Sequence, residues 1–269
     1  MSAKVINFAN FKGGVGKTTT TTILANILSQ FGHNTLVIDF DPQGNSSDML
    51  MKTAGLGDEI PKSIFEGIQQ QDITDCVMYI KQDLALIPSD FDLIGFPLFL
   101  NKTTKNDLMK RAYLLDYLIE PLRAKYDYII IDTPPTISDY TNNAVVASDY
   151  VSIVMQTHPW SFRASKHFIP YLQEMIDEYD TNIHLLGIVP VMLKTDGKMD
   201  DYIMRLAQQE YKEHMFSSEI KHSERVKRYA LSGITNDLIH DKRIKKMYGK
   251  LLSEVLERVE QHERRYIEQ

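Results

Sequence analysis

Two kinds of hydrophobic pattern alternate along the chain. Short stretches that are almost continuous in Ile, Val and Leu, such as "YDYIIIDT", predict strands that are covered on both faces of a sheet. Longer stretches in which apolar residues recur every three or four positions predict helices with one buried side. The strands are expected at residues 4–10, 35–40, 84–88, 126–133, 150–156 and 184–193. The helices are expected at residues 17–31, 107–124, 139–147, 160–179 and 199–213.

This alternation predicts an α/β fold, with a doubly wound, mostly parallel sheet flanked by helices. The chain contains no internal repeat, low-complexity tract or Gly/Ser linker, so residues 1–269 are expected to form a single domain. Pro170 is expected to kink or split the helix at 160–179, because proline removes a backbone donor. Trp160 and Phe162, near the start of that helix, are interpreted as core residues rather than contact residues.

The segment 242–264 has the pattern of an amphipathic helix. Its apolar residues stand three or four positions apart, with charged residues between them. These apolar residues are Ile244, Met247, Leu251, Val255 and Val259. We expect this side of the helix to pack onto the sheet, and contact with a partner or a membrane is the alternative.

The stretch "FKGGVGKTT", residues 11–19, resembles a phosphate-binding loop with one departure. Gly16, Lys17 and Thr18 fit the pattern G-x-x-x-x-G-K-[ST], but the first glycine of that pattern falls on Phe11, and a second lysine, Lys12, follows it. The loop lies between a predicted strand and a predicted helix. In that context backbone N–H groups and the helix N-terminus attract phosphate.

The loop therefore predicts an ATP site of the P-loop NTPase kind. Lys17 is expected to reach the β- and γ-phosphates, and the Thr18 hydroxyl is expected to ligate Mg²⁺. The full set of expected ATP-binding residues is Lys12, Gly13, Gly14, Val15, Gly16, Lys17, Thr18 and Thr19.

Three aspartates follow predicted strands and complete this site. "VIDFDPQGN" contains Asp39 and Asp41, and "IIIDTPP" contains Asp132. All are expected at the carboxyl edge of the sheet, where such folds bind ligands. We expect Asp39 and Asp132 to serve the metal, Asp132 through water, and Asp41 to orient or deprotonate the attacking water. A strand-end aspartate that merely begins a turn is the plainer alternative.

Composition and charge narrow the setting. No apolar run approaches the roughly 20 residues needed to cross a bilayer, and no signal peptide is recognised, so a cytoplasmic protein is expected. Cys76 is the single cysteine, which favours a reducing compartment. The net charge of -6 hides a basic segment at 221–250, in which nine Lys and Arg residues stand against three acidic ones.

These motifs together resemble the ParA-type partition ATPases, within the deviant Walker A group that also contains MinD. The resemblance rests on "KGGVGKTT", "DFDPQGN", "LIPSDFDLIG" and "IIIDTPP" in this order, and it spans almost the whole chain. It implies ATP and Mg²⁺ as cofactors and a homodimer of two facing ATP-bound subunits. The signature lysine, matched by Lys12, would reach the phosphates bound by the partner. Lys12, Lys17 and Asp41 are therefore the expected catalytic residues.

The resemblance further implies nonspecific binding to double-stranded DNA, a nucleoid location, and stimulation of ATP hydrolysis by a ParB-like centromere-binding partner. The stretch "EIKHSERVKRYALSGITND" resembles a family segment, with Arg225 at its second arginine and Gly233 at its glycine. His222 and Arg228 depart from that segment. The expected DNA-binding residues are Lys221, Arg225, Lys227, Arg228, Lys242, Arg243, Lys245 and Lys246.

Other functions account for the sequence less well. A MinD-like positioning ATPase would bind membrane through its C-terminal helix, but "LLSEVLERVEQHERRYIEQ" mixes acids with bases and lacks the cationic side of an interfacial helix. Iron–sulfur relatives need at least two cysteine ligands per chain, and Cys76 is single. Small-molecule ligases of similar fold have no evident use for the basic segment. A basic surface exposed only to solvent is the remaining alternative for that segment.

Overall fold

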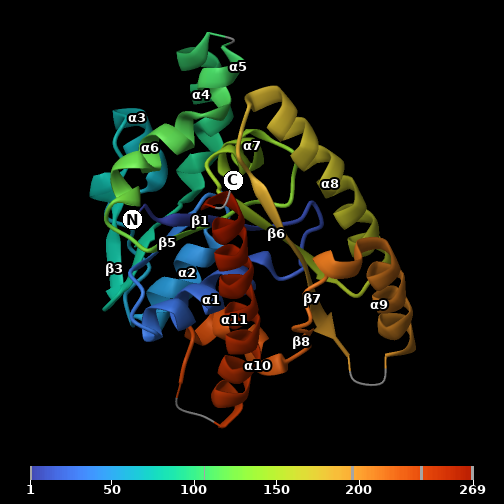
Figure 1. The fold of residues 1–269 in the computed structure, drawn as a ribbon. Coiled ribbons are helices and arrows are strands. Elements are labelled where there is room, and N and C mark those ends of the chain that lie inside the picture. The colour runs from blue at the N-terminus through green and yellow to red at the C-terminus, as the bar shows by residue number, and fades with distance from the viewer. Residues whose placement is uncertain (1, 106, 195–196, 237–238, 268–269) are drawn as a thin grey trace.

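The computed structural model describes residues 2–105, 107–194, 197–236 and 239–267. Its described strands form one sheet in the order β3-β4-β2-β5-β1-β6-β7-β8 (Figure 1). Neighbouring strands are parallel except β3 and β4, which are antiparallel. The strands are β1 (Lys4–Ala9), β2 (Thr35–Asp39), β3 (Met78–Lys81), β4 (Leu84–Ile87), β5 (Tyr128–Asp132), β6 (Tyr150–Gln156), β7 (His184–Leu193) and β8 (Ile220–Lys221). The predicted mostly parallel, doubly wound sheet is confirmed.

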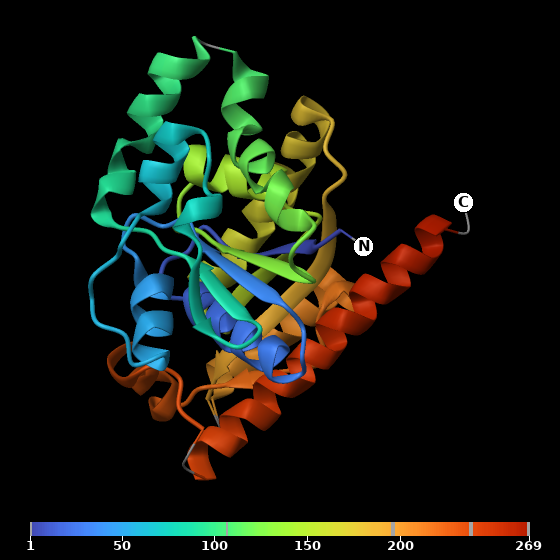
Figure 2. The same ribbon diagram turned by 90° about the vertical axis from the view of Figure 1, so that its left-hand side faces the viewer.

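Helices cover both faces of the sheet (Figures 1 and 2). The first face packs against α1 (Lys17–Gln30), α2 (Asn45–Thr53), α10 (Glu224–Ser232) and α11 (Ile239–Ile267). The second face packs against α3 (Ile64–Gln70), α4 (Phe96–Thr104), α5 (Leu108–Ala112), α6 (Leu114–Arg123), α7 (Asp139–Val146), α8 (Pro159–Tyr179) and α9 (Lys198–Tyr211).

Alternate side chains of the central strands enter different cores. Ile130 belongs to the core under α1 and α11, whereas Ile129 and Ile131 belong to the core on the opposite face. Because successive strand side chains point to opposite faces, a strand buried on both faces needs apolar residues at consecutive positions. This explains the unbroken apolar run of β5.

The C-terminal helix packs onto the sheet layer as predicted. α11 contacts α1 and β7, and its buried residues include Ile244, Leu251, Val255 and Val259 (Figure 1). Figure 2 shows it crossing the molecule diagonally, with its last turns beyond the other helices. In the described part of the chain, no helix is both long and apolar enough to cross a membrane.

Several boundaries differ from the predictions. The helix expected at 107–124 is divided at Tyr113 into α5 and α6. α8 continues through Pro170, so the expected split is wrong. The helix tolerates this proline because Pro170 lies on its exposed side, where water can bond to the carbonyl that lacks a backbone donor. The Trp160 side chain is 67% exposed, so its assignment to the core is also wrong. Phe162 is partly buried against Tyr211, as expected.

Leu251→Ala tests the packing of α11. It should lower the free energy of unfolding by about 2–5 kcal/mol, because the side chain is completely buried and its loss leaves a cavity. Urea unfolding followed by circular dichroism measures the difference. Leu231→Ala is the matched control, since Leu231 is 80% exposed. Equal loss in the two variants would contradict the described packing.

Candidate active site

The loop between β1 and α1 is held in a conformation that requires glycine. Gly14 and Gly16 have φ angles of 75° and 91°, in the left-handed region, and Gly16 is the N-cap of α1. Asn10 fixes the start of the loop, because its Nδ2 donates to the Val154 carbonyl at 2.8 Å and its Oδ1 accepts from the Lys12 backbone N–H at 2.9 Å. The loop thus directs the N-terminus of α1 toward the carboxyl edge of the sheet.

Phe11 explains the departure from the general loop pattern. Its ring lies 4.5 Å from the Phe168 ring and 5.1 Å from the Tyr171 ring, measured between centroids. Both partners belong to α8. The position that would be glycine therefore attaches the loop to a helix on the second face of the sheet.

Lys17 lies within the site, and Lys12 lies outside it. The Lys17 side chain is buried, and this burial lowers its pKa, while the negative charges of Asp132 and Asp41 oppose the shift. Lys12 is exposed, and its Nζ donates to the Gly13 carbonyl at 3.1 Å. The two lysines therefore have different surroundings, one facing buried carboxylates and one facing solvent.

Asp39 and Asp132 are directly opposite each other in the β2–β5 register, and both are completely buried. Burial and, to a lesser extent, the nearby charge of Asp132 together raise the pKa of Asp39 to about 8, while hydrogen bonds from Ser47 oppose the shift. Burial also raises the pKa of Asp132, against hydrogen bonding from Ser46. Two adjacent buried carboxylates cannot both ionise cheaply without a cation.

The donor set fits Mg²⁺. Oδ1 of Asp132 is buried and makes no hydrogen bond of normal geometry, although the Thr18 side chain lies close to this carboxylate. Mg²⁺ prefers oxygen ligands and retains several waters, so it needs few protein ligands. The described residues contain no group of three or more His, Cys, Asp or Glu side chains that could enclose a metal ion. Thr18, Asp39 and Asp132 thus lie together as predicted, and their role in metal binding stays a prediction.

Asp41 follows β2 and lies near Lys17. Its Oδ1 accepts the Gln43 backbone N–H at 3.0 Å. Burial raises the pKa of Asp41, while that hydrogen bond and the Lys17 charge lower it. A carboxylate held in this way, close to Lys17, is suitably placed to orient water.

Two serines of this site were not found by sequence reasoning. Ser46 Oγ donates to Asp132 Oδ2 at 2.6 Å, and Ser47 donates to Asp39 Oδ2 through its backbone N–H at 2.8 Å and its hydroxyl at 2.7 Å. Both belong to the first turn of α2, which begins after Gly44 with φ 62°. The signal available in the sequence was the serine pair directly after "DPQGN".

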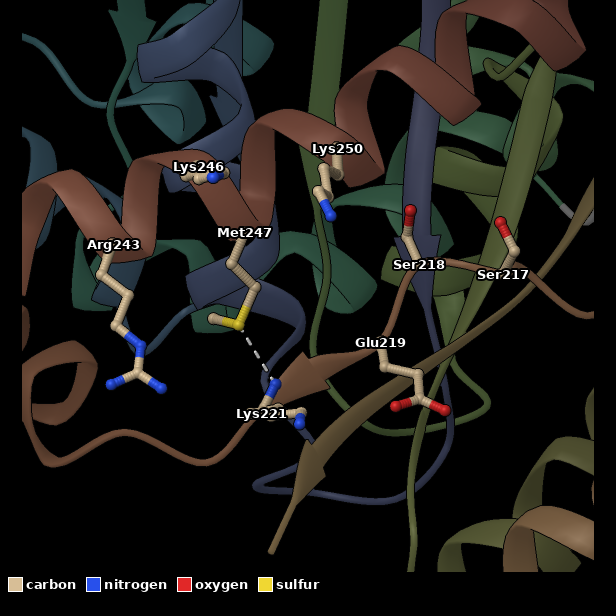
Figure 3. Close-up of a pocket in the computed structure, with 8 residues that line it drawn as sticks. All are labelled: Ser217, Ser218, Glu219, Lys221, Arg243, Lys246, Met247 and Lys250. Carbon is tan, nitrogen blue, oxygen red and sulfur yellow. Dashed lines mark hydrogen bonds between the residues drawn. The ribbon is translucent and has the colours of Figure 1, made fainter. Parts of the chain in front are cut away.

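A second surface gathers part of the basic segment (Figure 3). Lys221 of β8 and Arg243, Lys246 and Lys250 of α11 line an open groove of about 440 Å³, together with Glu219 and Met247. In Figure 3, Arg243 and Lys250 extend from α11 toward the side on which Lys221 lies. We call this surface the basic groove. Four cations against one carboxylate give it a positive potential.

The other predicted DNA-binding residues are distributed differently. Lys227, Arg228, Lys242 and Lys245 are exposed, and Lys227 pairs with Glu224 at 2.9 Å. Arg225 instead bonds within the protein, because its Nε lies 2.6 Å from Oδ1 of the buried Asp241 and its guanidinium donates to Thr235. We therefore assign Arg225 a structural role and leave it out of the DNA-binding set. Residues 237–238 of the basic segment lie outside the described residues.

Comparison with known proteins shows what this chain is similar to. A family model described as an AAA domain matches residues 3–185. The chromosome-partitioning ATPase Soj of Thermus thermophilus is 32% identical over 201 residues, which cover 74% of this chain and 73% of the relative.

Solved structures show the same fold. McdA from Cyanothece without nucleotide has a TM-score of 0.81 at 25% identity, covering 94% of this chain and 99% of that one. A putative plasmid partition protein from Borrelia burgdorferi, bound to AMPPNP, has a TM-score of 0.74 at 25% identity, covering 93% of this chain and 99% of that one.

Asp39→Asn tests the buried carboxylate pair in protein free of nucleotide and magnesium. Between about pH 4 and pH 8 the folded protein holds a proton on Asp39 that the unfolded chain has lost, so wild-type stability should fall as pH rises through this window. The variant should show a flatter profile and its largest relative gain near pH 8.5. Thermal unfolding midpoints at pH 5, 7 and 8.5 measure this. Asp75→Asn, at an exposed carboxyl, is the control; an Asp39→Asn slope equal to wild type would contradict the assignment.

Proposed function

The chain belongs to the ParA-type partition ATPases, and from this premise we propose that it is an ATP-gated, DNA-binding dimer that positions DNA. Family membership implies ATPase activity on a P-loop site. The observation that carries the proposal is the meeting of Lys17 with Asp39, Asp41 and Asp132 at the carboxyl edge, beside an exposed Lys12. A basic groove on the same chain supplies the second activity.

ATP would be bound by the loop from Lys12 to Thr19. Its backbone N–H groups and the α1 N-terminus favour phosphate, and Lys17 places a cation among the phosphate oxygens. Thr18, Asp39 and Asp132 would hold Mg²⁺, which when bound supplies positive charge at the phosphates. Ser46 and Ser47 orient the two metal-binding carboxylates through the hydrogen bonds described above. Asp41 would orient the attacking water or accept its proton.

Lys12 would act on the nucleotide of a second subunit. Its exposed ammonium bonds only weakly to the adjacent Gly13 carbonyl, so it can leave that contact at small cost. A cation that approaches the transferred phosphoryl group stabilises its spreading negative charge. Because the two facing lysine-rich loops repel each other without phosphate between them, ATP would favour the dimer.

The basic groove would bind the phosphate backbone of double-stranded DNA. Its lining includes Lys221, Arg243, Lys246 and Lys250, and Lys227, Arg228 and Lys242 are exposed as well. Such contacts are independent of sequence and weaken steeply with salt, and a dimer doubles their number.

We further propose, from the family alone, that a ParB-like partner stimulates hydrolysis and that the protein associates with the nucleoid. The MinD-like membrane alternative is less favoured, because the apolar side of α11 is buried against the sheet layer.

Lys12→Ala tests the exchange of lysines between subunits. It should bind ATP almost as wild type does but remain monomeric, and hydrolysis should fall by about a hundredfold or more, because the trans cation is missing. Size-exclusion chromatography with light scattering, with ATP and with ADP, measures the association. Lys102→Ala, another exposed lysine, is the control. An ATP-dependent dimer of Lys12→Ala would argue against a role across the interface.

Arg243→Ala/Lys246→Ala/Lys250→Ala tests the basic groove. Wild type should shift random-sequence DNA in electrophoretic mobility assays with ATP much more than with ADP. In the variant, the slope of log K against log salt should fall by about three, because each phosphate contact contributes roughly 0.9. ATP binding should not change. Lys102→Ala/Lys105→Ala/Lys110→Ala removes the same charge elsewhere; an equal loss of DNA binding there, or binding to liposomes instead of DNA, would count against the groove.

A further inference from the structure

α2 is bonded to the metal-binding carboxylates at one end and to α10 at the other. At its start, Ser46 and Ser47 bond to Asp132 and Asp39 at distances of 2.6–2.8 Å. The Ser47 hydroxyl also accepts the Ser89 backbone N–H at 2.9 Å. The first turn of α2 therefore follows the positions of both carboxylates.

The last turn of α2 makes equally specific contacts. Thr53 Oγ1 accepts the Ile234 backbone N–H at 2.8 Å, and Lys52 Nζ donates to the Ala230 carbonyl at 3.3 Å. Gly233 has φ 69°, and a Cβ there would lie 2.3 Å from the Thr53 backbone nitrogen. Backbone thus packs against backbone, which leaves little room for the two helices to move independently.

α10 connects α2 to α11, a helix that lines the basic groove. It carries Lys227 and Arg228, and its Arg225 and Tyr229 both bond to the buried Asp241 of α11. α11 in turn carries most cations of the basic groove. α2 itself has nine residues and spans about 13 Å at 1.5 Å per residue, short enough to move as a rigid rod.

We infer that α2 is the coupling element that transmits the state of the ATP site to the DNA-binding surface, with Thr53 as the residue that fixes its far end to the backbone directly after α10. The inference rests on the proposed function. Nucleotide and metal at Asp39 and Asp132 set the position of Ser46 and Ser47. α2 then shifts Thr53, and with it α10, relative to the basic groove.

This coupling must be reciprocal. If ATP strengthens DNA binding by some factor through α2, DNA strengthens ATP binding by the same factor. A change at Thr53, about 9 Å along the helix from Ser47, should therefore weaken both effects equally. A residue with a purely structural role would lower stability without changing this factor.

Thr53→Val tests the inference, because valine keeps the shape but cannot accept the Ile234 N–H. Fluorescence anisotropy with labelled random-sequence duplex DNA gives the dissociation constants with ATP and with ADP. A fluorescent ATP analogue gives nucleotide affinity with and without DNA. The ATP-to-ADP ratio of DNA affinities should fall by about fivefold, as expected for one lost hydrogen bond, and the DNA effect on ATP affinity should fall by the same factor.

Two further variants separate coupling from general damage. Thr53→Ser retains the hydroxyl and should restore the wild-type ratio. Thr104→Val is the matched control. The hydroxyls of Thr53 and Thr104 both donate to the carbonyl four residues earlier in their helices, at 2.7 Å and 2.8 Å, so both variants lose this bond. It should leave the ratio unchanged. If Thr53→Val does not fold, Lys52→Met removes the neighbouring contact with Ala230 and is judged by the same measurements.

The outcomes are distinct. A wild-type ratio in the folded Thr53→Val or Lys52→Met protein would overturn the coupling and leave the proposed function intact. An equal fall in Thr104→Val would also overturn it, because the effect would then be general. If wild-type DNA binding does not depend on ATP, the proposed function fails and the coupling fails with it.

Discussion

The adjacency of two buried carboxylates is the constraint on which the rest of the site depends. Asp39 and Asp132 end neighbouring parallel strands in the same register, so the sheet itself brings them together with no access to water. Their repulsion and burial are what raise the pKa of Asp39 to about 8. Such a pair is costly unless a proton or a cation is shared, and Lys17 alone offsets it only in part. The arrangement is therefore suited to a divalent ion bound together with a polyphosphate.

Local sequence predicted the parts of this site that depend on backbone pattern. The continuous apolar runs identified the central strands, and the glycines around Lys17 identified the loop, because these features follow from burial on two faces and from positive φ angles. The partners of the carboxylates could not be found in this way. Ser46 lies 86 positions from Asp132 in the chain, and only the packing of α2 brings them together. Phe11 likewise has its aromatic partners in α8, far along the sequence.

Counting charges predicted the basic segment but not the direction of its side chains. Arg225 belongs to the same short run as Lys227 and Arg228, yet its guanidinium bonds to the buried carboxylate of Asp241, which is costly to bury without compensating charge. Pro170 and Trp160 show the same limit for helices. The cost of proline depends on whether the freed carbonyl faces water, and the burial of an aromatic residue depends on which side of the helix it occupies. Both are properties of the assembled fold.

The contrast between the two lysines of the loop follows from these constraints. Lys17 compensates the charges of Asp132 and Asp41 from a buried position beside them. This burial lowers the pKa of Lys17. The cation that we propose to compensate a triphosphate held by another subunit would have to stay in solvent until that subunit arrives, and Lys12 is exposed. Phe11 fixes the phosphate loop to α8 and serines fix the carboxylates to α2, so the site is attached to helices on both faces of the sheet. The proposed effect of ATP on DNA binding and on dimerisation would therefore start from this single site.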